Sequence, residues 1–328
     1  MKKILVIQTA SIGDVILATA LIESLHNSFS EASIDFMVKK GNENLFKSHP
    51  FLNRVIIWDK RAAKYSGFLA ITRQVRQTQY DLVVNIQRFF LTGLLTVLSG
   101  AMETRGFSKN PLSALFTRRF KHQLGSNLHE VDRNQALISD LTIPGKIVPK
   151  LYPSVEDEDV VSPYMSGKYY TVSPASLWFT KQYPVEKWID LIRHIPGDAK
   201  IFLLGGPGDL ALCSEIVRQS SHTGVKILAG QLTLLQSAAL MRNAGMNFTN
   251  DSAPMHLASS VNAPVTAIYC STVPQFGFGP LSSDSTVVET TEQLSCRPCG
   301  LHGYSACPEK HFRCAFDIKT EMLTRNLH

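Results

Sequence analysis

The chain has 328 residues, about the length of two ordinary domains. Its 44% hydrophobic content and its aperiodic glycines and prolines exclude disordered and fibrous proteins. The net charge of +6 is unevenly divided, because residues 1–150 carry +9 and residues 151–328 carry −3. This asymmetry indicates that the first half meets something anionic; nucleic acid, a lipid headgroup and a phosphorylated sugar all fit.

Two apolar segments bear on membranes and targeting. Residues 89–102, FFLTGLLTVLSGAM, are fewer than the roughly 20 apolar residues that cross a bilayer. We expect a buried helix there, with a membrane-facing role as the alternative. The start, MKKILVIQTASIGD, has two lysines before an apolar stretch but no small-residue cleavage site. We therefore expect the first strand of a cytoplasmic protein rather than a signal peptide.

Short apolar runs alternate with helical patterns through the first half. Apolar spacing predicts helices over 11–29 and 67–80. Strands are expected at the short apolar runs 3–8, 33–40, 54–60 and 81–87. This alternation is typical of a parallel sheet covered on both faces.

The pattern breaks at residues 146–159, which hold two prolines and a four-residue acidic run. We interpret this stretch as a linker and place the domains at 1–155 and 156–328. A DxD-type metal site in the acidic run is the alternative, and it is disfavoured because no strand precedes the run.

The second half repeats the same alternation. Strands are expected within 169–176, 199–209, 225–230, 246–251 and 263–270. Helices are expected at 185–195, 210–220, 232–244 and 253–262. The fold class is therefore α/β, with two doubly wound domains facing one another across a cleft and ligands at the carboxyl ends of the strands.

The first strand-to-helix turn, QTASIGDV, carries one candidate for chemistry. It lacks the GxGxxG fingerprint of dinucleotide-binding proteins, which disfavours an NAD or FAD enzyme. Gly13 allows a ligand to approach the backbone closely. Asp14 either caps the following helix or acts as a general base that takes a proton from an attacking hydroxyl.

The stretch TNDSAPMHLASSVNAPV predicts a strand followed by a helix whose start is marked by Asp251, Ser252 and Pro254. Free N–H groups and the helix dipole make such a start an anion site, here for a nucleotide diphosphate. His256 can bond a phosphate or simply pack. A capped helix with nothing bound remains the alternative.

The stretch SPASLWFTKQYPVEKW is a second candidate for phosphate binding. Its loop of small hydroxyl residues ends in a lysine, so Ser176, Thr180 and Lys181 can hold phosphate oxygens. A plain surface lysine is the alternative reading of Lys181.

Four cysteines cluster near the end in a CxxC motif followed by two more: Cys296, Cys299, Cys307 and Cys314. This spacing can form a structural zinc site, with His302 or His311 as substitute ligands. Reduced, packed thiols are an equally weighted alternative, and disulfides are disfavoured in the cytosol.

Taken together, these segments resemble glycosyltransferase family 9, the ADP-heptose:lipopolysaccharide heptosyltransferases. The resemblance rests on IQTASIGDVILATALIESL, PASLWFTKQYPVEKW, LLGGPGD and TNDSAPMHLASSVNAPVTAIY, in that order. It implies the GT-B fold of two Rossmann-like domains, with the acceptor bound mainly by the first domain and the sugar nucleotide by the second.

The resemblance also implies roles for single residues. Asp14 falls on the catalytic base, and Lys181, with Ser176 before it, falls on the phosphate-binding lysine. The family's D-[ST]-G-x-x-H stretch falls on Asp251, Ser252 and His256. Ala253 stands where the family usually has glycine, so the added methyl can shift the diphosphate.

The implied reaction is an inverting, metal-independent transfer of a heptose or similar sugar from an ADP-sugar to a lipopolysaccharide core, without a cofactor. Nucleic acid is then not a partner, and peripheral contact with the inner membrane is possible. Gly13 and the basic stretch 104–123 are expected to meet the anionic acceptor, through Arg105, Arg118, Arg119 and Lys121. A solubilising basic loop is the alternative for that stretch. For the whole chain the alternatives are a GT-B epimerase using a UDP-sugar and a nucleotide-binding module without turnover.

Overall fold

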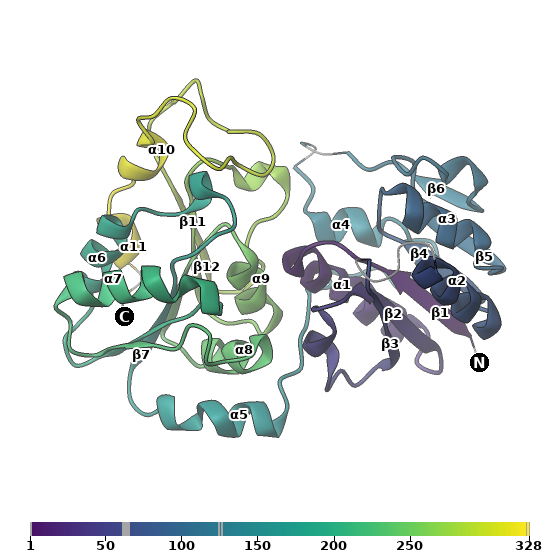
Figure 1. The fold of residues 1–328 in the computed structure, drawn as a ribbon, viewed down its shortest axis with the longest axis horizontal. Coiled ribbons are helices and arrows are strands. Elements are labelled where there is room, and N and C mark those ends of the chain that lie inside the picture. Colours follow the sequence, from purple (N-terminus) through teal and green to yellow (C-terminus); the bar gives the residue numbers. More distant parts are fainter. Residues whose placement is uncertain (1, 61–65, 124, 126, 326, 328) are drawn as a thin grey trace. The chain divides into compact units, whose positions relative to one another are not determined.

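The structure, a computed structural model, describes residues 2–60, 66–123, 125, 127–325 and 327. The chain divides into two compact units, Met1–Tyr152 and Pro153–His328 (Figure 1). Each unit holds one six-stranded sheet in which neighbouring strands pair in parallel. Two doubly wound α/β units are therefore confirmed.

The first sheet has the strand order β3-β2-β1-β4-β5-β6. Its strands are β1 (Lys3–Ile7), β2 (Ser33–Lys39), β3 (Leu52–Trp58), β4 (Leu82–Asn85), β5 (Glu103–Phe107) and β6 (Arg118–Phe120). The order reverses between β1 and β4, so loops leaving these two strands diverge and leave room for a ligand at their carboxyl ends.

The helices of the first unit pack on this sheet, with α1 against α4 and α2 against α3 (Figure 1). They are α1 (Ile12–Ser28), η1 (Glu43–Phe46), α2 (Ser66–Thr78), α3 (Phe90–Leu98), η2 (Ser113–Leu115) and α4 (Glu130–Gln135). Helix α1 is buried along most of its length, as its nearly continuous apolar sequence requires.

Two expectations for the first unit need correction. Helix α3 is shorter than residues 89–102, and its first turn is open to solvent: Phe89, Phe90 and Leu91 are 51%, 52% and 38% exposed. The basic stretch 104–123 is not simply a loop, because half of it, ten of its 20 residues, lies in β5, η2 and β6.

The segment expected to be a linker contains a helix, α5 (Val155–Val161). Ser154 Oγ accepts a hydrogen bond from Asp157 N, and the Asp157 carboxylate accepts one from Ser154 N in return. The acidic run therefore forms the start of a helix, where negative charge is favoured by the dipole. This structural role explains the acidic residues without a DxD metal site.

The second sheet repeats the order of the first, as β12-β11-β10-β7-β8-β9. Its strands are β7 (Tyr169–Ser173), β8 (Lys200–Leu203), β9 (Val225–Ile227), β10 (Met246–Asn250), β11 (Val265–Tyr269) and β12 (Ser285–Glu289). Here the order reverses between β7 and β10, the two strands that precede the predicted phosphate-binding stretches.

The helices of the second unit are η3 (Ser162–Tyr164), η4 (Phe179–Lys181), α6 (Val185–His194), η5 (Pro207–Asp209), α7 (Leu210–Ser220), α8 (Leu234–Arg242), α9 (Ala253–Ser260), η6 (Pro274–Phe276), α10 (Arg313–Phe316) and α11 (Glu321–Thr324). The tail holds the two short helices α10 and α11. It returns to the core, where Cys314, Ile318 and Leu323 pack in one cluster with Trp188. None of the described helices is both long and apolar enough to span a membrane.

Candidate functional site

The first loop places Asp14 in the opening turn of α1. Ser11, with an extended backbone, holds the N-cap position, and its Oγ donates to Asp14 Oδ2 at 2.5 Å. The interpretation of Asp14 as the N-cap is therefore wrong. Asp14 is half-buried, and Gly13 is buried beside it. An acid in this turn is favoured by the helix dipole.

Neighbouring strand ends support this loop. Lys60, just after β3, donates from Nζ to Thr9 Oγ1 at 2.8 Å. Gln87, just after β4, donates from Nε2 to Gln8 Oε1. Burial lowers the pKa of Lys60. Sequence reasoning missed Lys60, Gln8 and Gln87, although each lies within two residues of the carboxyl end of a predicted parallel strand.

In the second unit, the two predicted phosphate-binding stretches meet. Lys181 Nζ lies 2.6 Å from Asp251 Oδ2, and both side chains are largely buried. Thr272, which follows β11, donates from Oγ1 to the same carboxylate oxygen at 2.6 Å. Asp251 therefore holds Lys181 in place.

Helix α9 begins directly after Asp251. Ser252 is its N-cap, and Pro254 occupies its first turn. Ser252 and Ala253 are half-buried, whereas His256, one turn further, is only 6% exposed. Pro254 has no N–H, and Met255 N donates to Ser252 O, which leaves the Ala253 N–H of the first turn to meet a ligand at the positive dipole end beside Lys181.

Asn250, the last residue of β10, ties together both ends of the loop that carries Lys181. Its Nδ2 donates to Pro174 O at 2.8 Å, and its Oδ1 accepts from Tyr183 N at 2.9 Å. The side chain is fully buried. Nothing in the local sequence pointed to Asn250, because its role depends on the tertiary closeness of residues 174 and 183.

Thr180 and Ser176 differ in their positions within this loop. Ser176 is half-buried, and its carbonyl accepts from Gln182 Nε2 at 2.7 Å. Thr180 has no exposed surface, and its hydroxyl accepts from Ser271 Oγ and from Tyr304 N. The expected contact between Thr180 and phosphate does not fit this burial. The Thr180 side chain is buried under its own loop, whereas the Lys181 side chain is partly exposed to solvent.

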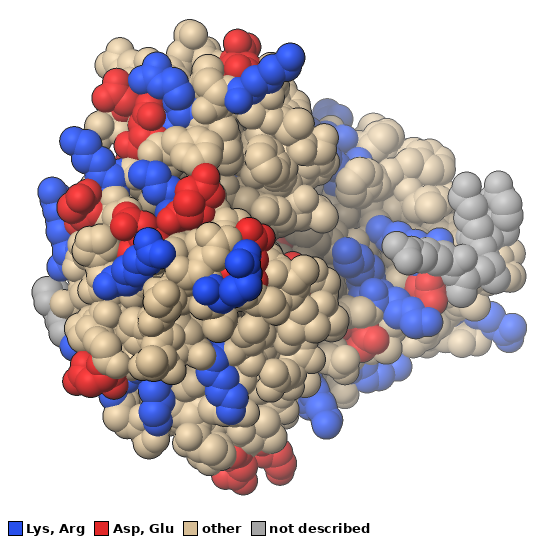
Figure 2. All heavy atoms as spheres, turned by 60° about the vertical axis from the view of Figure 1, so that its left-hand side comes forward, with Lys and Arg blue, Asp and Glu red and all other residues tan. Residues whose placement is uncertain are grey.

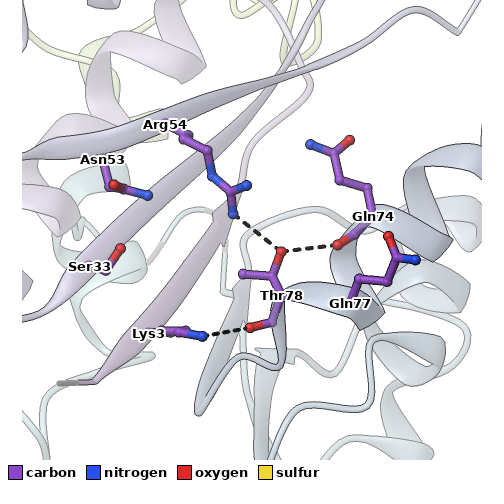
Figure 3. Close-up of a pocket in the computed structure, with 7 residues that line it drawn as sticks. All are labelled: Lys3, Ser33, Asn53, Arg54, Gln74, Gln77 and Thr78. Atoms are coloured by element: carbon purple, nitrogen blue, oxygen red, sulfur yellow. Dashed lines mark hydrogen bonds between the residues drawn. The ribbon is translucent and has the colours of Figure 1, made fainter.

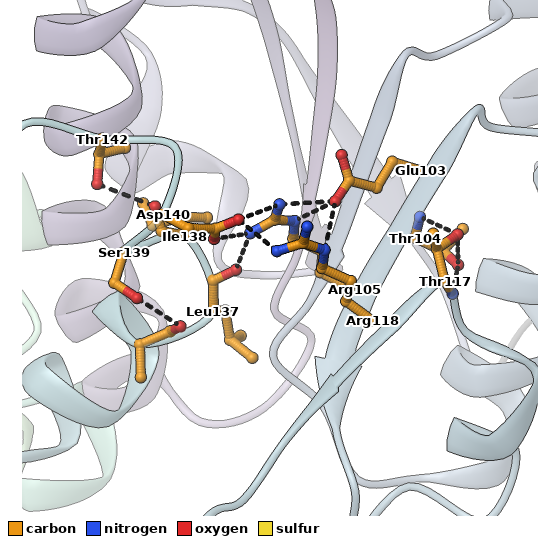
Figure 4. A network of polar contacts seen from close by, with 11 residues as sticks. Glu103, Thr104, Arg105, Thr117, Arg118, Leu137, Ile138, Ser139, Asp140 and Thr142 are labelled. Carbon is orange, nitrogen blue, oxygen red and sulfur yellow. Dashed lines mark hydrogen bonds and ion pairs between the residues drawn. The ribbon is translucent and has the colours of Figure 1, made fainter.

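The predicted acceptor-binding arginines also separate into two kinds. Arg105 is 1% exposed and binds the carboxylates of Glu103 and Asp140 and the carbonyl of Leu137 (Figure 4). Its burial and pairing fit a role within the fold rather than contact with an acceptor. Arg118 joins the same network through Asp140 Oδ2, at 2.5 Å, but stays half-exposed. Of the predicted set, Arg119 and Lys121 are the residues that are exposed and form no ion pair with another described residue.

The four clustered cysteines line one cavity of about 210 Å³, together with Thr180, Tyr304, His311 and Phe312. All are free thiols. Burial raises the pKa of Cys314 to about 12 and also raises that of Cys299. Within the described part of the chain, no group of three or more His, Cys, Asp or Glu is arranged to hold a metal ion, so the expected zinc site has no support.

A second cavity, of about 430 Å³, opens in the first unit near the amino ends of β1, β2 and β3 (Figure 3). Its basic lining residues are paired within the protein. Lys3 Nζ donates to the carbonyl of Thr78, and Arg54 is paired with Asp35. It lies at the opposite ends of the strands from Asp14 and is not part of the candidate site.

On the face of the second unit turned toward the viewer in Figure 2, basic and acidic side chains are interspersed.

Comparison with known proteins agrees with the fold. Lipopolysaccharide heptosyltransferase 3 of Escherichia coli is 24% identical over 277 residues, which are 79% of this chain and 81% of that protein. A glycosyl transferase family 9 structure from Veillonella parvula superposes with a TM-score of 0.86 at 21% identity, over 99% of this chain and 96% of that one. The E. coli ADP-heptose lps heptosyltransferase II gives 0.81 at 22% identity, over 100% and 97%. These likenesses confirm the GT-B fold.

The model of one protein family matches residues 68–304, well over half of the chain. The match includes Lys181, Asp251 and Ser252 and begins after Asp14. The chain therefore belongs to glycosyltransferase family 9, the heptosyltransferases.

Proposed function

We propose that this glycosyltransferase moves a heptose from ADP-heptose to the core of lipopolysaccharide. The observation that carries the proposal is the Lys181–Asp251 ion pair beside the start of α9. It joins a held cation to helix N–H groups where the second sheet reverses its strand order, which is the usual place for a nucleotide in such folds.

In this proposal the diphosphate of the donor binds at Lys181, Ser252 and the Ala253 N–H at the start of α9. When the bond from the anomeric carbon to the diphosphate oxygen breaks, negative charge grows on that oxygen. A fixed ammonium group and oriented N–H groups stabilise that charge without reorganising. Asp251 contributes by holding Lys181, and Ala253 sets how closely the diphosphate approaches the backbone.

Asp14 is the proposed general base of the inverting step. The acceptor hydroxyl gives its proton to the Asp14 carboxylate while its oxygen forms the new bond to the anomeric carbon, and ADP leaves. The short hydrogen bond from Ser11 orients the carboxylate. The resemblance to the family implies that no metal or cofactor is needed.

The first unit is the proposed acceptor-binding part. Its net charge of +9 over residues 1–150 favours an acidic, phosphorylated core, and Arg119 and Lys121 are open to meet it. The exposed Phe89, Phe90 and Leu91, with Arg88 stacked 5.7 Å from the centre of the Phe89 ring, suit peripheral contact with anionic lipid at the inner face of the cytoplasmic membrane.

The test is transfer by the purified chain from ADP-heptose to a heptose-deficient lipopolysaccharide core, followed by mass spectrometry of the product and by ADP release. We expect a mass gain of one heptose that requires both substrates. Formation of free sugar or an epimer from a UDP-sugar without acceptor would instead identify a nucleotide-sugar epimerase. Nucleotide binding without any turnover would identify a binding module.

A further inference from the structure

The loop that carries Lys181 is hydrogen-bonded to a segment near the end of the chain. We define this segment, residues 297–304, as the clasp. Thr180 N donates to Tyr304 O at 3.1 Å, and Tyr304 N donates to Thr180 Oγ1 at 2.8 Å. These paired bonds join the residue next to Lys181 to the clasp across more than a hundred positions of sequence.

The clasp is itself anchored to the carboxyl end of β11. The guanidinium of Arg297 donates to the carbonyls of Cys270 and Thr272, at 2.8 and 2.7 Å, and pairs with Glu289. Cys299 N donates to Ser271 O at 2.8 Å. The backbone of residues 270–272 is thus fixed by the clasp.

Residues 271 and 272 connect the clasp to Lys181 through two sets of hydrogen bonds. Ser271 Oγ donates to Thr180 Oγ1 at 3.0 Å, which holds the loop backbone. Thr272 Oγ1 donates to Asp251 Oδ2, which holds the lysine side chain through the ion pair. Thr180, Ser271 and Thr272 are all buried, so water does not compete for these bonds.

Gly303 shows how tightly the clasp fits. Its φ is +79°, a conformation that favours glycine. A Cβ at this position would lie 2.8 Å from Thr180 Oγ1 and 3.3 Å from Lys181 Cγ. The clasp therefore approaches the lysine loop as closely as a residue without a side chain allows.

From this geometry we propose that the clasp positions Lys181 for the diphosphate of the donor. Gly303 and Arg297 are positioning residues that act through Lys181 and do not touch the donor. The Cys-rich tail thereby acquires a role in donor recognition. The inference rests on the proposed function only in taking the ligand to be a diphosphate.

Gly303→Ala tests the proposal, with Gly300→Ala as the matched control. Gly300 also has a positive φ, +65°, so alanine is strained at both positions, but a Cβ at 300 would meet only the Tyr304 ring, at 3.6 Å or more. The dissociation constants of ADP and of pyrophosphate are measured by calorimetry. We expect Gly303→Ala to weaken both ligands at least fivefold and Gly300→Ala to change them less than twofold.

A double-mutant cycle with Lys181→Met shows whether the effect passes through the lysine. In the Lys181→Met background, Gly303→Ala should weaken ADP no further. Should Gly303→Ala not fold, Thr180→Val, which removes the hydroxyl, should weaken ADP in the same non-additive way, while Thr180→Ser restores it.

Three results overturn the inference. The first is that the two glycine variants change ADP affinity equally in the wild-type background. The second is that Gly303→Ala weakens ADP by the same factor with and without Lys181. The third is that Thr180→Val binds ADP with wild-type affinity. Binding of pyrophosphate distinguishes failure of this inference from failure of the proposed function. If the wild-type chain binds pyrophosphate but not ADP, the proposed donor is wrong, and the role of the clasp can still be tested with pyrophosphate. A chain that binds neither contradicts both.

Discussion

Lys181 and Asp251 form a largely buried ion pair, with Nζ 2.6 Å from Oδ2, that joins the loop after β7 to the start of α9. The pair brings a positive charge to the end of a helix that is itself positive. Two positive charges close together favour the binding of an anion. Without the Asp251 carboxylate they would repel each other, and the lysine would be less stable in this position. Asp251 is therefore the residue that keeps the cation at the site.

Asp251→Asn tests whether Asp251 holds Lys181 in place, because the two alternatives predict opposite changes in ADP affinity. If Asp251 merely stood near the diphosphate, removing its negative charge would strengthen ADP binding. We expect weakening of about tenfold, because Lys181 loses the carboxylate that holds it. Calorimetry with ADP measures this, and the exposed Asp198→Asn is the control for a change in net charge.

The proposed base is tested by Asp14→Asn. The amide cannot accept the proton of the acceptor, so kcat should fall by ~10²–10⁴, while the dissociation constant of ADP stays within twofold of wild type. Exposed Glu31→Gln, which removes a carboxylate from the same unit, should leave kcat unchanged. Normal turnover in Asp14→Asn would limit this residue to favouring the start of α1.

Arg105 and Arg119 should separate stability from acceptor binding. Arg105→Met removes a buried cation from Asp140 and Glu103, which stay partly exposed and keep Arg118, so the free energy of unfolding should fall by about 1 kcal/mol. Arg119→Glu should leave stability unchanged and raise the KM for acceptor severalfold, without changing that for donor. Chemical denaturation and steady-state kinetics measure the two effects, and unchanged acceptor kinetics in Arg119→Glu would remove it from the acceptor surface.

The Arg105 network also predicts a dependence on pH. The hydrogen bond from Arg105 lowers the pKa of Asp140 below its ordinary 3.8. The stabilisation from this pair is therefore fully present above that value and is lost as the pH falls through the lower, folded-state pKa. The difference in unfolding free energy between wild type and Arg105→Met should narrow in acid. A difference that is constant between pH 6 and pH 3 would contradict the pairing.

The exposed start of α3 predicts membrane contact. Wild type should sediment with vesicles containing phosphatidylglycerol and remain in solution with pure phosphatidylcholine, because apolar rings and Arg88 act together. Phe89→Ser/Phe90→Ser should lose this binding while the dissociation constant of ADP is unchanged. Exposed Leu177, in the second unit, gives a matched control, and Leu177→Ser should bind vesicles as wild type does. Loss of acceptor turnover in the phenylalanine variant with vesicle binding intact would instead place the rings in acceptor recognition.

The alternation of apolar runs and helical patterns was enough to predict β1 to β4 and β7 to β11, because buried parallel strands are short apolar runs, but it did not predict β5, β6 or β12. Strand β5 escaped because its sequence, ETRGF, carries charges, and the burial of Arg105 depends on Asp140, far along the chain. Helix α5 could have been found, since Ser154 and Asp157 have capping-box spacing. Asp14 and Lys181 stood out locally, whereas Asn250 and Gly303 act through tertiary contacts that no local pattern reveals.

The most direct test of the proposed function is a thermal-shift panel of ADP, UDP, GDP and NAD on wild type and on Lys181→Met. A ligand at 100 times its dissociation constant adds about 2.7 kcal/mol of stability, enough to raise the Tm visibly. We predict a rise with ADP alone, and a much smaller rise in Lys181→Met at the same concentration. A rise with UDP, GDP or NAD but not ADP, or the same ADP shift without the lysine, would contradict the account.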